Sequence, residues 1–162
     1  MGKNILVIHP GALGDVVLSF PALVRMKRQG DVRLSLWCAQ QTGRLARDLG
    51  VVDSYYPTES RTFTGLFETH WTQETARFCR KHDSIVFIGN SGTLAGGLET
   101  NYGGKRYWVS ARPDTKDECH VAVHLIRAFQ KQGLIDQKQD AFNALTPDTL
   151  GEAAPAAADC FS

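Results

Sequence analysis

Apolar residues occur in short runs along this chain, and runs typical of strands alternate with runs typical of helices. Residues 4–9 read N-I-L-V-I-H, a run rich in apolar β-branched residues that fits a strand buried on both faces. Residues 15–29 carry apolar side chains at helical spacing, with Lys27 and Arg28 near the end and Gly30 just after it, as is typical of a helix C-terminus. The opening therefore predicts a strand, a glycine loop and a helix that is kinked at Pro21.

The alternation continues to residue 134. Further strands are predicted at 32–38, 51–56, 84–88 and 105–109, and further helices at 42–49, 70–81 and 116–132. The polar segment 58–69 is ambiguous, and we expect its apolar side chains Phe63, Leu66 and Phe67 to pack against the body. Strands and helices alternating at this spacing favour a parallel sheet with helices on both faces, which is a Rossmann-like α/β fold.

The last part of the chain has a different pattern. From Asp136 onward there is little periodic apolar content, and residues 152–158 are rich in alanine with one proline. This composition is typical either of an interdomain linker or of an ordinary frayed terminus. We divide the chain into a Rossmann-like domain, 1–134, and a linker-like tail, 135–162, and composition alone leaves both interpretations of this tail open.

Composition restricts the class of protein. With 162 residues, 43% hydrophobic and 22% charged, the chain fits one soluble α/β domain with a real core. No apolar run is long enough for a membrane span, and the short one near the N-terminus lacks the form of a signal peptide. We therefore expect a cytoplasmic chain whose four widely spaced cysteines are separate thiols.

Charge is unevenly distributed. Residues 1–131 hold 17 Lys and Arg against 12 Asp and Glu, whereas residues 132–162 hold one Lys against five acids. This balance is too mild for a protein that binds duplex nucleic acid, so no nucleic-acid partner is expected. A mildly basic body suits an anionic small molecule or a lipid headgroup.

The loop from Gly11 to Asp15 is the strongest local signal of a site. In an open parallel sheet, ligands bind outside the carboxyl ends of the strands, where glycines let the backbone approach them. The following helix start offers N–H groups to anions, and Asp15 adds a carboxylate, although capping that helix would also explain an aspartate. The G-x-x-G spacing and the lack of an acid after residue 38 disfavour a dinucleotide site, and Gly103 to Arg106 is no phosphate loop.

Residues 5–23 resemble the opening of the family 9 glycosyltransferases, the lipopolysaccharide heptosyltransferases. The strand, the G-x-x-G-D turn and the Pro-Ala-Leu at residues 21–23 stand in the same order. Later features are compatible but less specific, among them the strand at 83–88 and the segment 120–125. The resemblance covers roughly residues 4–134, and only the first twenty or so are diagnostic.

The resemblance implies the N-terminal, acceptor-binding half of a two-domain GT-B glycosyltransferase, with the tail 135–162 leading to a C-terminal donor-binding domain that is absent from this sequence. The complete enzyme would transfer heptose or a related sugar, with inversion, from a nucleotide-diphosphate sugar (ADP-heptose) to the anionic core of lipopolysaccharide. It implies Asp15 as the general base on the acceptor hydroxyl. A peripheral contact with the inner face of the bacterial inner membrane is expected, and no cofactor.

The same resemblance suggests which residues bind the acceptor. They are His9, Gly11, Ala12, Leu13, Gly14, Arg61, Asn90 and Ser91. Two positions depart from the family: it often carries Arg or Lys in place of His9, and an acid or glutamine near residues 89–92, which we expect to be an exit loop. Asn90 and Ser91 also fit a plain turn and Arg61 a solvated surface, while Arg112 has weaker support than Arg61.

Two other classes of function remain as alternatives. The first is a free-standing Rossmann-like module that binds a nucleotide or another ligand without catalysis; the second, a nucleotide-dependent oxidoreductase, is disfavoured by the missing acid. A zinc site at Cys119, His120 and His124 lacks a fourth ligand, so we expect no metal and assign these residues to packing or the surface.

Overall fold

The computed structural model describes residues 2–90 and 92–137, and in this part of the chain five strands form one parallel sheet in the order β3-β2-β1-β4-β5. The strands are β1 (Lys3–Ile8), β2 (Val32–Cys38), β3 (Ser54–Pro57), β4 (Ser84–Ile88) and β5 (Lys105–Val109). The helices are α1 (Leu13–Val17), α2 (Phe20–Arg28), α3 (Gln40–Asp48), α4 (Arg61–Gly65), α5 (Gln73–Cys79), α6 (Gly92–Asn101) and α7 (Val121–Lys131).

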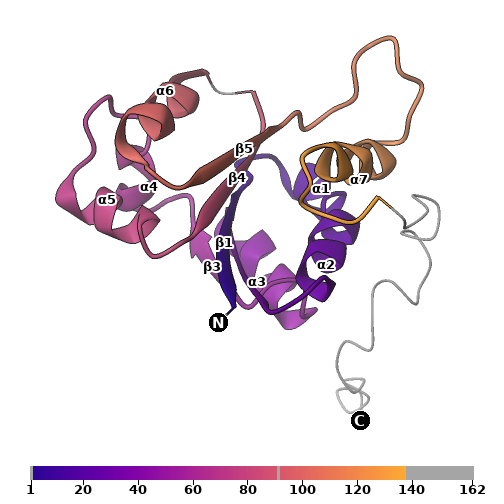
Figure 1. The fold of residues 1–162 in the computed structure, drawn as a ribbon, viewed down its shortest axis with the longest axis horizontal. Coiled ribbons are helices and arrows are strands. Elements are labelled where there is room, and N and C mark those ends of the chain that lie inside the picture. Colours follow the sequence, from indigo (N-terminus) through magenta and orange to yellow (C-terminus); the bar gives the residue numbers. More distant parts are fainter. Residues whose placement is uncertain (1, 91, 138–162) are drawn as a thin grey trace.

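Helices cover both faces of the sheet. On one face lie α1, α2, α3 and α7, and on the other lie α4, α5 and α6 (Figure 1). Successive residues of β1 alternate between the two cores: Ile5 and Val7 enter the first, and Leu6 and Ile8 the second. Because the central strands are buried on both faces, they need continuous apolar runs, and the Rossmann-like prediction is confirmed.

The first predicted helix is wrong in one respect. In place of a kinked helix over 15–29, the chain forms α1 and α2, which are separated at Leu18 and Ser19. Pro21 lies in the first turn of α2, where main-chain N–H groups have no acceptor within the helix. The missing N–H of proline therefore breaks no hydrogen bond there, and no kink is required. The Ser19 hydroxyl is buried and donates to the Val16 carbonyl oxygen at 2.6 Å, which stabilises the break.

The sequence prediction missed α6, which begins within the expected exit loop. Three of its ten residues are glycines and its apolar positions have little helical periodicity. A Cβ on Gly97 would lie 2.5 Å from the Leu66 carbonyl oxygen and 3.2 Å from the Trp71 indole nitrogen. Glycine is needed there because α6 packs closely against the loop after α4, which is a tertiary requirement rather than a helix break.

Most other predictions hold, with shifted ends. The strands at 32–38, 84–88 and 105–109 have the predicted bounds, whereas β3 begins three residues later than expected. The ambiguous segment contains α4, with Phe63 and Leu66 buried and Phe67 packed beside them. Helix α7 begins at Val121, and residues 116–120 before it are not helical.

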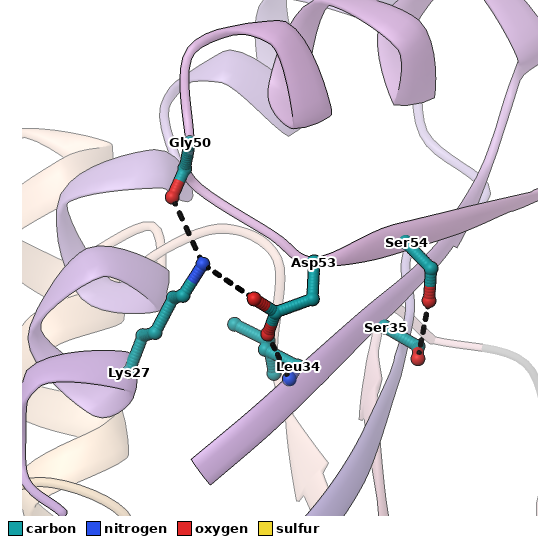
Figure 2. Close-up of polar contacts among 6 residues, drawn as sticks. All are labelled: Lys27, Leu34, Ser35, Gly50, Asp53 and Ser54. Carbon is teal, nitrogen blue, oxygen red and sulfur yellow. Dashed lines mark hydrogen bonds and ion pairs between the residues drawn. The ribbon is translucent and has the colours of Figure 1, made fainter. Parts of the chain in front are cut away.

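Polar contacts tie α2 and the strands together at the amino edge of the sheet (Figure 2). The Asp53 carboxylate binds the Lys27 ammonium at 2.8 Å and accepts from the Leu34 N–H at 2.7 Å, and the hydroxyls of Ser35 and Ser54 lie 2.8 Å apart. Burial acts to raise the pKa of Asp53, but these donors and nearby basic charges outweigh it and lower the pKa. At pH values above the ordinary pKa of an aspartate, Asp53 therefore stabilises the fold. This contribution is lost as the pH falls through the lowered pKa.

Three of the four cysteines lie in the described part of the chain. Cys38 and Cys79 are buried, Cys119 is half-buried, and all three are free thiols, as predicted. Most of the linker-like tail, residues 138–162, lies outside the described residues. Of the helices that the structure describes, none has the length and apolar character needed to cross a membrane.

Candidate functional site

The predicted site lies where the direction of strand order reverses. Strands β1 and β4 are neighbours, yet the chain leaves β1 for α1 on one face and leaves β4 for α6 on the other (Figure 1). Loops that diverge in this way leave a crevice at the carboxyl ends of the two strands, which is where open α/β sheets bind ligands. The segment from His9 to Asp15 and the turn at Gly89 and Asn90 both lie at this point.

His9 is buried under the first loop. Its side chain is 1% exposed, its main-chain N–H donates to the Trp37 carbonyl oxygen at 2.9 Å, and its Nδ1 accepts from the Gly11 N–H at 3.3 Å. Burial lowers its pKa to about 4, against a smaller opposing effect of Asp15, so the ring is neutral at pH 7. Because protonation is unfavourable only in the folded chain, His9 makes stability fall as the pH drops from 6.5 towards 4.

Gly11 is required by the packing of this loop. A Cβ at this position would lie 2.7 Å from the His9 Cε1 and 3.3 Å from the Asp15 Cβ. Gly14 differs, because a Cβ there would meet no atom within 4 Å. The first glycine therefore serves the fold of the loop, whereas the second leaves open space beside Asp15.

Replacing each of the two glycines by alanine is expected to change the stability of the fold differently. Gly11→Ala should lower the free energy of unfolding by about 1–3 kcal/mol, because the His9 ring must move to admit the methyl group. Gly14→Ala, the matched control, should leave stability unchanged or raise it by up to about 1 kcal/mol, since alanine favours helices. Urea denaturation of both variants measures the difference, and equal stabilities would contradict this geometry.

Asp15 lies in the first turn of α1 and is not its cap. The N-cap residue is Ala12, and α1 has no side-chain capping bond, so the capping interpretation is wrong. The Asp15 Oδ1 lies 3.4 Å from the Nη2 of Arg112, 97 positions away in sequence. Arg112 is 72% exposed and Asp15 30%, so this is a weak, solvated ion pair that leaves the carboxylate accessible.

The other predicted acceptor residues lie at different depths and places. Ala12, Leu13 and Gly14 are exposed at the start of α1, and Asn90 is exposed after β4. Ser91 is outside the described residues. Arg61 is the exposed first residue of α4, in the layer on the other face from α1, and forms no ion pair within the described part of the chain.

The residues considered for zinc have other contacts. His120 is the N-cap of α7 and its Nδ1 accepts from the Ala122 N–H at 3.3 Å. The His124 Nε2 lies 3.0 Å from the Ser110 carbonyl oxygen. Within residues 2–90 and 92–137, no group of three or more potential ligands is placed to hold a metal ion.

Several solved structures with a similar fold are glycosyltransferases. A family 9 glycosyl transferase from Veillonella parvula aligns with a TM-score of 0.58 at 17% identity, over 86% of this chain and 44% of that one. This chain has the fold found in family 9 glycosyltransferases. The E. coli heptosyltransferase WaaC with ADP gives a TM-score of 0.61 at 12% identity (85% and 49% covered), and the E. coli ADP-heptose LPS heptosyltransferase II gives 0.58 at 17% (90% and 44% covered).

The likeness extends to the fold and to part of these proteins. The chain spans less than half of the length of each of the three structures. The sequence itself matches no family model and no curated protein.

Sequence reasoning did not identify the contact between Arg112 and Asp15. It gave Arg61 more support than Arg112 as an acceptor-binding residue, and the structure places Arg112 beside Asp15. No local pattern could reveal a pair so far apart in the chain. The burial of His9 did have a signal, because strand alternation places it on the same face as Val7, under the first helical layer.

Proposed function

We propose that this chain is the acceptor-binding half of an inverting glycosyltransferase. In this proposal the complete enzyme transfers heptose or a related sugar from a nucleotide-diphosphate sugar, ADP-heptose, to the anionic core of lipopolysaccharide. The proposal is carried by the accessible carboxylate of Asp15 at the point between β1 and β4, in a fold shared with heptosyltransferases. One of these similar structures holds ADP and another is an ADP-heptose LPS heptosyltransferase, which supports this donor class.

Asp15 is the general base of the proposed reaction. The acceptor hydroxyl donates a hydrogen bond to the carboxylate and passes its proton there as the new glycosidic bond forms. On the other side of the sugar, the bond to the nucleoside diphosphate breaks, and groups of a second domain stabilise that leaving group. Arg112 must yield part of its contact with the carboxylate, which a weak 3.4 Å ion pair permits.

Asp15 has a buried residue, His9, beneath its loop and exposed side chains of α1 beside it. Neutral His9 positions Gly11 from below and has almost no surface of its own for a ligand, so its part is positioning. On α1 the side chains of Leu13 and Val17 are 56% and 36% exposed beside Asp15. In this proposal the exposed rim meets the second domain or the acceptor.

A titration of the chain with two ligands tests the proposal. A delipidated anionic core saccharide and ADP are added in parallel, and binding is followed by NMR and calorimetry. The acceptor-half assignment predicts saccharide binding that weakens with salt, with shifts at Gly11 to Asp15, and little response to ADP. Arg112→Gln should weaken saccharide binding several-fold, about 3–10-fold for one charge-assisted contact, whereas Lys105→Gln at the opposite edge should not.

Other outcomes would overturn the assignment. Tight ADP binding without saccharide binding would favour a free-standing nucleotide module. Saccharide binding that leaves Gly11 to Asp15 unperturbed would place the ligand elsewhere, and no response to either ligand would remove the support for an acceptor site.

A further inference from the structure

A basic hollow lies on the other face of the sheet from Asp15. Its volume is about 630 Å³, and it is lined by residues of α5, of the segments flanking this helix and of the end of α6. The side chains that line it include three cations, an indole and two amides: Arg77, Arg80, Lys81, Trp71, Gln73 and Asn101. No acidic residue lines this hollow. It is therefore a separate feature from the candidate acceptor site.

The three cations of the hollow form no salt bridge with the described residues. Arg80 and Lys81 follow Arg77 by three and four residues at the end of α5, and none of the three side chains forms a hydrogen bond with the described residues. The acids nearest in sequence have other contacts. Glu74 accepts from the Thr62 hydroxyl at 3.1 Å, and Asp83 accepts from the Asn4 N–H at 2.8 Å.

Two other residues of the wall, Trp71 and Asn101, are fixed by hydrogen bonds. The side-chain oxygen of Asn101 accepts from the Trp71 N–H at 3.3 Å, and its amide nitrogen donates to the carbonyl oxygens of Thr69 and Gly97 at 2.9 and 2.8 Å. The Trp71 indole N–H donates to the Leu66 carbonyl oxygen at 3.2 Å. The hollow thus combines an indole fixed by hydrogen bonds with three exposed cationic side chains.

We propose that this hollow binds a phosphate-bearing anion. Two guanidinium groups match the geometry of phosphate oxygens, and the ammonium of Lys81 adds a third positive charge. The volume lies in the range of ligand pockets and exceeds one phosphate, so an organic group joined to the phosphate can lie against the indole. Cations near a helix end also offset the helix dipole, but that role requires neither a hollow nor a fixed aromatic wall.

Pyrophosphate is the first probe, added to the 162-residue chain at about 150 mM salt, where general charge effects are screened. Binding is followed by calorimetry and by the NMR signal of the Trp71 indole N–H. The triple variant Arg77→Gln/Arg80→Gln/Lys81→Gln should weaken binding about tenfold or more, because it removes all three charge-assisted contacts. The matched control, Lys116→Gln/Arg127→Gln/Lys131→Gln, removes three exposed cations from α7 and the segment before it, and should weaken binding less than about twofold.

Vesicles distinguish the two sources of phosphate. Binding to phosphatidylglycerol but not phosphatidylcholine vesicles, lost in the triple variant and retained in the control, assigns the hollow to lipid headgroups. Binding of pyrophosphate without vesicle binding assigns it to a free phosphate compound. Equal weakening by both triple variants, an unperturbed Trp71 signal, or no binding of either probe would overturn the proposal, whatever the result at Asp15.

Discussion

Replacing Trp37 by alanine should lower the free energy of unfolding by about 3–5 kcal/mol, as truncation of a fully buried aromatic side chain does. Trp37 is 1% exposed at the end of β2 and packs edge-on against Tyr56, Phe63 and Phe78, with ring centroids 4.7–6.3 Å apart. Its indole N–H also donates to the Pro57 carbonyl oxygen at 2.9 Å. One side chain thus joins the second core to strand β3 and to helices α4 and α5.

The size of this loss is large relative to the stability of the whole domain, which for such proteins is about 5–15 kcal/mol. Urea denaturation followed by circular dichroism measures it. Trp37→Phe is the graded companion, because it keeps most of the ring contacts and loses the hydrogen bond, and it should cost about 1–3 kcal/mol. A loss below about 1 kcal/mol for alanine would contradict the packing described here.

The elements that the sequence predicted best are those specified by local pattern. Strand β4 has five buried residues between Asp83 and Gly89, so its apolar run and its ends coincide. Helix α6 was missed because its glycines looked like a loop. Gly97 is needed there because a Cβ would clash with the Leu66 carbonyl oxygen, which lies far from it in sequence. Local sequence patterns therefore predict the strands of the sheet. Whether a glycine ends a helix or allows it to pack closely depends on contacts with residues far away in the sequence.

The candidate site shows the same division. The position of Asp15 after a buried strand predicted its place at the carboxyl edge, and the fold confirms that placement. The sequence could not show that Ala12 is the N-cap, because an aspartate close to a helix start is an equally good candidate. Nor could the sequence show that Arg112 contacts Asp15, because this contact depends on where the segment after β5 lies relative to α1.

Asp15→Asn, in the two-domain transferase that this chain would form part of, should lower kcat by about 10²–10⁴-fold, the usual contribution of a general base. Asparagine keeps the size and shape of the side chain but cannot take the proton of the acceptor hydroxyl. Because Asp15 makes no capping bond and only a solvated ion pair, the variant should change stability by less than about 1 kcal/mol. Loss of the rate would then reflect chemistry and not folding.

The comparison of kcat with binding decides between a catalytic and a binding role for Asp15. If the carboxylate acts as base, KM for the acceptor and saccharide binding by the isolated chain change little, because asparagine still accepts a hydrogen bond from the hydroxyl. Arg112→Gln provides the companion variant, since it removes the partner of Asp15 but leaves the base in place, and its effect should appear mainly in KM. A rate within about tenfold of the parent for Asp15→Asn would be too high for a missing base, and the proton would then need another acceptor.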